Sequence, residues 1–113
     1  MNKRKLGNQA ELKVIEFLKK KKFTILKHNY YSPYGEIDII ALKNKEYYFI
    51  EVKSISSNLI NPVFKLNKKK KENIYKTSLD YISKTEYKDE NIQYYIFIEH
   101  KNQISYYSFN IAP

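Results

Sequence analysis

The sequence contains no cysteine. That absence excludes disulfide bonds, thiolate zinc sites and thiol nucleophiles, and it fits a reducing compartment. No apolar run approaches the roughly 20 residues that a membrane-spanning helix needs, and the N-terminal residues lack the apolar stretch of a secretory signal. We therefore expect a cytoplasmic protein.

Glycine and arginine are also scarce. Gly7 and Gly35 are the only glycines, which excludes Gly-rich phosphate cradles and dinucleotide-binding turns. A bound phosphate would then be held by side chains or by a metal. Arg4 is the only arginine, so nearly all of the positive charge comes from lysine. Because lysine lacks the rigid fork of arginine, any nucleic-acid contact should favour the backbone over the base sequence.

Positive charge, by contrast, is abundant. The 113 residues carry 21 basic and 12 acidic side chains, a net charge of +9. Such an excess indicates a polyanion partner such as nucleic acid. A lysine-rich solvated surface is the alternative, because lysine, isoleucine, asparagine and tyrosine are abundant together, as expected under codon bias toward A and T. The length and the 42% hydrophobic content fit one domain, residues 1–113.

The hydrophobic pattern predicts an alternation of helices and strands. Apolar residues at helical spacing indicate a first helix over about residues 6–22. Three strands are expected over residues 23–31, 36–43 and 46–54, with a turn at residues 32–35. After a loop over residues 56–62, we expect a second helix from Leu66 to about Thr85 and closing strands over residues 92–99 and 103–109.

Two lysine runs occupy different ends of these helices. Lys19 to Lys22 closes the first helix, where cations complement the helix dipole, so this run has a sufficient structural explanation. The second run opens the second helix, where cations oppose the dipole, and is the better candidate for a phosphate contact. It comprises Lys68, Lys69, Lys70 and Lys71. Counting back one turn from Ile74 places Lys70 on the inward stripe of that helix.

The second and third predicted strands alternate apolar and charged residues. Ile37, Ile39 and Ala41 should therefore share one face, with Glu36, Asp38 and Ile40 on the other. On the next strand, Tyr48, Ile50 and Val52 should point one way, and Phe49, Glu51 and Lys53 the other. Partial burial of the charged face is favoured by its apolar members, Ile40 and Phe49.

A hairpin turning at Asn44-Lys45 brings two acids together. It sets Asp38 opposite Glu51 and Glu36 opposite Lys53, and paired residues have Cβ atoms about 4.5–5.5 Å apart. Two acids at that separation repel unless a cation lies between them, and oxygen ligands of this kind suit Mg²⁺. We predict a magnesium site. The alternative is a solvated sheet face with cross-strand ion pairs, and Glu36 is either a third acid or a partner for Lys53.

Other side chains receive structural interpretations. His28 and His100 have no companion at metal-ligand spacing, and we interpret both as structural or exposed. The twelve tyrosines are mainly sheet formers, because the adjacent pairs Tyr47-Tyr48, Tyr94-Tyr95 and Tyr106-Tyr107 all fall in predicted strands.

The order of elements, with an acid on one strand and Glu-x-Lys on the next, resembles the PD-(D/E)XK nuclease superfamily. More closely, the chain resembles the bacterial YraN family of predicted endonucleases, in Gly7-x-x-Ala10-Glu11, Asn29, Gly35-Glu36-Ile37-Asp38 and Phe49-Ile50-Glu51-Val52-Lys53. The resemblance implies a restriction-endonuclease-like α/β fold, an α+β mixed sheet in the order α-β-β-β-α-β-β flanked by helices. It also implies Mg²⁺- or Mn²⁺-dependent hydrolysis of phosphodiester bonds in DNA, including branched or flapped DNA.

The resemblance also implies roles for individual residues. Asp38 and Glu51 would ligate the metal, with the Val52 carbonyl as a third ligand. Lys53 would orient or deprotonate the attacking water and offset charge on the phosphate, while Glu11 would support the metal, the water or Lys53. Lys70 corresponds to a family helix lysine that would grip the substrate backbone.

This chain departs from its relatives in two places. Relatives often carry a basic residue soon after Glu-x-Lys, where this chain has Ser54-Ile55-Ser56, and an acid in the late strand, where it has Tyr95. We expect these changes to weaken substrate gripping and the support from the late strand rather than the metal ligands.

Two other functions remain open at this point. A non-catalytic nucleic-acid-binding module on the same scaffold would place Lys65 and Lys68 to Lys71 against phosphates and would bind with a steep salt dependence. A protein-interaction domain with an incidental acid cluster would neither bind nor cleave nucleic acid. Double-strand cleavage by one small site would call for two copies, that is, a homodimer.

Overall fold

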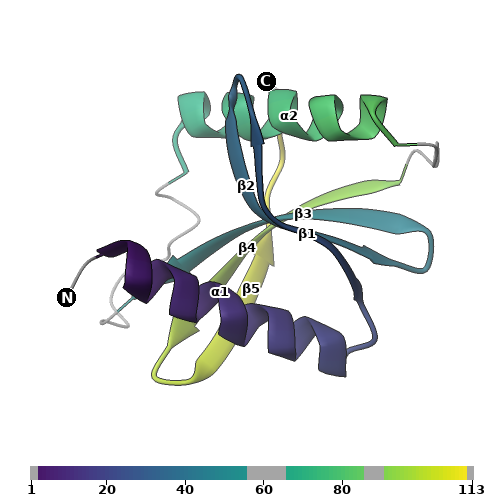
Figure 1. Ribbon diagram of the computed structural model, residues 1–113. Coiled ribbons are helices and arrows are strands. Elements are labelled where there is room, and N and C mark those ends of the chain that lie inside the picture. The colour runs from purple at the N-terminus through teal and green to yellow at the C-terminus, as the bar shows by residue number, and fades with distance from the viewer. Residues whose placement is uncertain (1–2, 56–65, 86–90, 112–113) are drawn as a thin grey trace.

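The computed structural model describes residues 3–55, 66–85 and 91–111. Over these residues the elements follow the predicted order α-β-β-β-α-β-β (Figure 1). The helices are α1 (Lys3–Lys20) and α2 (Lys68–Ser83), and the strands are β1 (Thr24–Ser32), β2 (Gly35–Lys43), β3 (Glu46–Ser54), β4 (Ile92–His100) and β5 (Gln103–Ser108). Each lies within a few residues of its predicted range, whereas the predicted loop over residues 56–62 lies outside the described residues.

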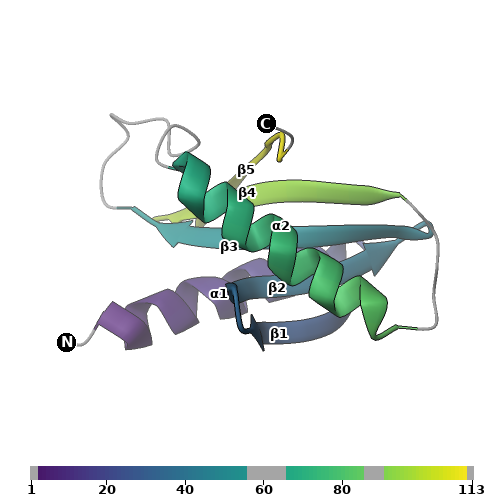
Figure 2. The ribbon, with the colours of Figure 1, turned by 90° about the horizontal axis from the view of Figure 1, so that it is seen from above.

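The strands form one mixed sheet in the order β1-β2-β3-β4-β5. Neighbours pair antiparallel except β3 and β4, which are parallel. A parallel pair needs a crossover connection, and α2 lies in the crossover between these two strands. The helices cover opposite faces of the sheet (Figure 2). The predicted mixed α/β architecture is confirmed, and it is compatible with a restriction-endonuclease-like core. In the described part of the chain, neither helix is long and apolar enough to span a membrane.

Helix α1 packs on its face of the sheet through a stripe of apolar residues. Ala10, Val14 and Leu18 recur every four residues and are almost completely buried. They pack against a cluster from the three central strands that includes Ile39, Ala41, Ile50, Val52 and Phe97. This spacing keeps the apolar side chains on one side of the helix. Helix α1 therefore covers β2 and β3 on one face of the sheet.

Helix α1 ends at Lys20, two residues before its predicted end at Lys22. Lys22 has a left-handed backbone with a φ of 72°. Its N–H donates to the Lys19 carbonyl, and the N–H of Phe23 donates to the Leu18 carbonyl, each at 3.0 Å. This pair of bonds is a Schellman motif, which satisfies carbonyl groups at a helix end. The helix therefore stops because the backbone turns left-handed within the lysine run.

Helix α2 begins directly at the second lysine run, as predicted. Asn67 is its N-cap, and the side-chain oxygen accepts a hydrogen bond from the Lys70 N–H at 2.8 Å. Such a cap satisfies a free N–H of the first turn, which offsets the unfavourable placement of lysines at this end. Ile74 is buried against the sheet with Tyr81 and Ile82 beside it, so the predicted apolar stripe is confirmed.

The predicted faces of β2 are correct near its C-terminal end and wrong near its start. Ile39 and Ala41 pack on the α1 side, but Ile37 packs in the cluster on the α2 side. The prediction assumed one uninterrupted alternation along the strand. The faces instead change between Ile37 and Ile39, which places Asp38 at the point of change.

The neighbouring strand β1 changes face at the same level. His28 contacts α1 through Glu11, whereas Tyr30 contacts α2 through Asp80. Between them Asn29 has a left-handed backbone with a φ of 59°. A left-handed residue interrupts the regular alternation of an extended strand, so the hairpin turns from one helix toward the other.

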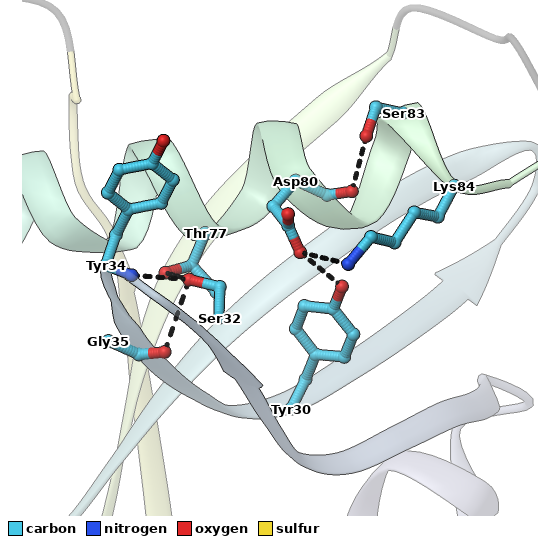
Figure 3. A network of polar contacts seen from close by, with 8 residues as sticks. All are labelled: Tyr30, Ser32, Tyr34, Gly35, Thr77, Asp80, Ser83 and Lys84. Carbon is cyan, nitrogen blue, oxygen red and sulfur yellow. Dashed lines mark hydrogen bonds and ion pairs between the residues drawn. The ribbon is translucent and has the colours of Figure 1, made fainter.

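The tip of the β1–β2 hairpin is fastened to α2 by polar contacts (Figure 3). The Ser32 and Thr77 hydroxyl oxygens are 2.7 Å apart, and the Tyr30 hydroxyl donates to Asp80 at 2.6 Å. Gly35 closes the turn with a φ of 145°, a conformation that favours glycine because it has no Cβ. These contacts join the end of β1 to α2, and through the hairpin they position β2, which carries one of the candidate acids.

Candidate functional site

The register of the β2–β3 hairpin decides how the two candidate acids meet. The predicted register is confirmed up to the pair Ile39–Ile50, where the ladder ends. The two further predicted rungs, Asp38–Glu51 and Glu36–Lys53, are not part of this described ladder. The Asp38 carboxylate instead accepts a hydrogen bond from the Val52 N–H at 2.8 Å. A side chain thus takes the place of a backbone partner for this N–H group.

Asp38 and Glu51 nevertheless form a close pair of buried acids. Their exposed fractions are 5% and 6%. Burial raises the pKa of the Glu51 carboxyl to about 8, and the charge of Asp38 and a hydrogen bond with it act in the same direction. Among the described residues, Oε2 of Glu51 is buried and has no hydrogen-bond partner. Such an acceptor is costly to bury, and it is available to a cation.

Two lysines stand beside this acid pair. Lys70 of α2 brings its Nζ to 3.6 Å from Glu51 Oε2, which confirms the prediction that this lysine faces the sheet. Lys53 lies two residues after Glu51 on β3, and the charges of both lysines lower the pKa of Glu51 against the effects of burial and Asp38. Residues from β2, β3 and α2 therefore converge on one point.

Glu11 lies near the pair but makes its close contact elsewhere. Its Oε1 is 2.7 Å from Nε2 of His28. Burial raises the pKa of the Glu11 carboxyl, and the charge of Asp38 adds to this rise, while His28 opposes it. Glu11 is thus within electrostatic reach of the acid pair. Its expected support of the metal, the water or Lys53 stays a prediction.

The contact between Glu11 and His28 could not be inferred from sequence spacing. His28 pairs with Ile39 across the β1–β2 ladder, and Ile39 belongs to the cluster under α1. Because paired residues share a face of the sheet, His28 points to α1 as Ile39 does. The strand register, and not metal-ligand spacing, is therefore the feature that indicates the contact of His28 with Glu11. His100, the other histidine, contacts the Ile55 carbonyl through Nδ1 at 2.7 Å.

A buried acid on β4 was also not identified from the sequence. Glu99 is 8% exposed, and it accepts a hydrogen bond from the Asn102 N–H at 2.8 Å. The Nζ of Lys13, on α1, lies 3.7 Å from the same carboxylate. Glu99 therefore stabilises the turn between β4 and β5 and links this turn to α1 through Lys13. We interpret this role as structural.

The lysines of α2 lie on two sides of the helix. Lys68 and Lys69 are exposed, whereas Lys70 and Lys71 are half-buried. A groove of about 720 Å³ beside the helix is lined by Lys68, Lys71, Glu72, Tyr75, Lys76, Asn110 and Ile111. It combines three cations with an exposed aromatic ring. Lys65, also expected to contact phosphate, lies outside the described residues.

The donors at the acid pair suit a hard divalent cation. Within the described ranges, no group of three His, Cys, Asp or Glu side chains surrounds a common point. The pair supplies two carboxylates, and the N–H and C=O of one strand residue point to the same edge. The Val52 carbonyl therefore faces the edge at which its N–H meets Asp38. Carboxylate and carbonyl oxygens, completed by water, are the ligands that Mg²⁺ prefers, so the residues present fit this ion.

Fold and site together define a mixed α/β protein that is compatible with a restriction-endonuclease-like core and that buries an acid pair on adjacent strands. Comparison with known families identifies it further. The model of "Uncharacterised protein family UPF0102" matches residues 10–106. The chain belongs to this family, which is the YraN family that its motifs indicate.

Individual relatives agree with this membership. A UPF0102 protein of Fusobacterium nucleatum subsp. nucleatum is 41% identical over 95 residues, covering 83% of this chain and 80% of the relative. One from Campylobacter lari is 40% identical over 98 residues, covering 87% and 86%. One from Campylobacter jejuni subsp. jejuni is 48% identical over 71 residues, covering 63% and 62%. These three names state no activity.

Proposed function

We propose that this protein is a metal-dependent nuclease that hydrolyses phosphodiester bonds in DNA, including branched or structured DNA. The observation that carries the proposal is the convergence of Asp38 and Glu51, two buried acids, with an unpartnered oxygen beside Lys70 and Lys53. Two acids are seldom buried together without a compensating cation, because burial penalises their charged forms.

Asp38, Glu51 and the Val52 carbonyl would hold Mg²⁺ or Mn²⁺, which lowers the pKa of bound water and stabilises negative charge on a phosphate. The Val52 N–H fixes the orientation of the Asp38 carboxylate. Lys53 lies two residues after Glu51 on β3. Its Nζ would donate hydrogen bonds that orient the attacking water and would offset charge on the phosphate. On the α1 side, Glu11 contacts His28 and is within electrostatic reach of Asp38.

The substrate class is supported by charge rather than by shape alone. The net charge is +9, and the groove beside α2 combines Lys68, Lys71 and Lys76 with Tyr75. Phosphate contacts by lysine carry little base information. We therefore expect recognition of the DNA backbone and its structure, in the cytoplasm, with little sequence preference.

The test is a cleavage assay on plasmid DNA and synthetic junctions. We expect cleavage with Mg²⁺ or Mn²⁺, none with EDTA, and losses of at least about 100-fold in Asp38→Asn, Glu51→Gln and Lys53→Met, since each removes a ligand or charge-stabilising group. Glu16→Gln and Lys27→Met, at exposed positions of α1 and β1, are the charge-matched controls. Cleavage that survives all three site substitutions would show that a contaminant is responsible.

The same reagents distinguish the alternative, a non-catalytic nucleic-acid-binding module. That function predicts salt-sensitive binding without a divalent ion and no product in its presence. Binding with no turnover at any divalent ion concentration would replace the nuclease proposal by this module.

A further inference from the structure

The contact between Lys70 and Glu51 lies at the oxygen that the proposed metal would use. Lys70 Nζ is 3.6 Å from Oε2 of Glu51. That oxygen is the buried acceptor which has no hydrogen-bond partner in the described part of the chain. A separation of 3.6 Å is too long for a hydrogen bond, so the ammonium compensates the carboxylate by charge alone.

The position of Lys70 is built into the helix. Its backbone N–H donates to the Asn67 cap at 2.8 Å, which places it in the first turn of α2. Ile74, one turn later, is 3% exposed and anchors the same side of the helix to the sheet. The neighbouring Lys69 carries the same charge but is exposed. The approach to Glu51 therefore belongs to Lys70 and not to the lysine run in general.

The charged groups that act on Glu51 are Asp38, Lys53 and Lys70. Lys53 belongs to the same strand as Glu51, so it keeps its place next to the carboxylate. Lys70 reaches the carboxylate from the opposing helix on a flexible side chain that is 40% exposed, and its Nζ is the cation that lies within ion-pair distance of Oε2 among the described contacts.

An ammonium and a divalent ion that lie against the same carboxylate oxygen repel each other strongly, so each weakens the binding of the other. We propose that Lys70 is a built-in competitor of the divalent cation, so that the ammonium and the ion alternate at Oε2 of Glu51. Binding of the ion then releases Lys70 to contact a substrate phosphate. This inference rests on the proposed function, and it makes metal binding the step that prepares Lys70 for the substrate.

The test measures Mn²⁺ affinity of the full chain by titration calorimetry in the absence of DNA. We expect Lys70→Met to bind Mn²⁺ about tenfold or more tightly than the wild type, since removing one charge a few ångströms from the ion removes a strong repulsion. Lys69→Met, which removes the same charge one position away, should stay close to the wild type. Lys70→Arg keeps the charge and should also stay close to it.

A second readout uses thermal unfolding of the same variants. With EDTA at pH 8, Lys70→Met should unfold at a lower temperature than Lys69→Met, because the Glu51 carboxylate loses its compensating charge. With saturating Mn²⁺ the two unfolding temperatures should become equal or change their order, because the ion supplies the compensating charge.

The outcomes separate this inference from the proposed function. If wild-type protein binds Mn²⁺, Glu51→Gln abolishes binding, and Lys70→Met binds no more tightly than the wild type, the competition is overturned and the metal site stands. If neither wild-type protein nor Lys70→Met binds Mn²⁺, the metal site fails and the competition fails with it.

Discussion

At the scale of single residues, the chemistry of this protein is concentrated in Glu51. Its carboxyl has an ordinary pKa of 4.5, which rises to about 8 in the fold because of burial first and the charge of Asp38 second. Between these two values the folded protein binds more protons than the unfolded chain. Stability must therefore fall as pH rises through this window. The carboxylate is kept at a cost to folding, which is typical of a functional group.

The first prediction concerns this pH dependence. In EDTA, the free energy of unfolding should fall from about pH 5 to pH 8, by an amount on the order of a few kcal/mol, since each pKa unit is worth about 1.4 kcal/mol. Glu51→Gln should remove most of this slope and be more stable than the wild type at pH 8. Urea denaturation at pH 5, 6.5 and 8 measures both.

Glu16→Gln is the control for this measurement, because Glu16 is an acid on α1 whose side chain is 70% exposed. Its pH profile should match that of the wild type. A wild-type profile that is flat, or one that rises toward pH 8, would contradict the description of Glu51 as an acid that is costly to ionise.

At the scale of elements, the C-terminus of α1 shows a local conflict between sequence and structure. Lys22 occupies the left-handed position of the Schellman motif with a φ of 72°, a position usually taken by glycine. A side chain with a Cβ is strained there by about 1–2 kcal/mol. The lysine adds favourable charge at the end of the helix dipole, which offsets only part of that strain.

The second prediction follows from this strain. Lys22→Gly should stabilise the protein by about 0.5–1 kcal/mol, because relief of the left-handed strain exceeds the loss of charge and the added freedom of the unfolded chain. Equilibrium unfolding in urea measures the change. Lys20→Gly, within the helix, should destabilise by about 1 kcal/mol, so two glycine substitutions two residues apart should differ in sign. Equal effects would show that the Schellman geometry does not form.

The elements themselves could be predicted because their signals are local. Periodicity located both helices and all five strands, and Asn44 and Lys45 form the predicted turn with φ values of 52° and 66°. The change of faces at Asp38 could not be predicted, since the alternation of β2 itself does not mark it, and the left-handed Asn29 that accompanies it lies on another strand. The contact of Glu11 with His28 and the partners of Glu99 likewise depend on which strand lies under which helix.

At the scale of the whole molecule, lysines gather at two places on different helices. Lys19 to Lys22 lies at the C-terminal end of α1, where it complements the helix dipole. Lys68, Lys71 and Lys76 line the groove on α2 together with Tyr75, on the helix that also supplies Lys70 to the acid pair. A polyanion in this groove would therefore lie beside the helix that reaches the candidate metal ligands.

The third prediction tests whether this groove, rather than total charge, governs nucleic-acid binding. Each neutralised phosphate releases counterions, so the slope of log affinity against log salt counts the contacts. Without divalent ions, the double variant Lys68→Gln and Lys71→Gln should lower this slope by about 2, roughly 1 for each lost phosphate contact. The double variant Lys19→Gln and Lys27→Gln also removes two positive charges, but outside the groove, and should change the slope by much less. Fluorescence anisotropy of labelled DNA over several salt concentrations measures both, and equal losses in the two variants would assign binding to net charge instead of to the groove on α2.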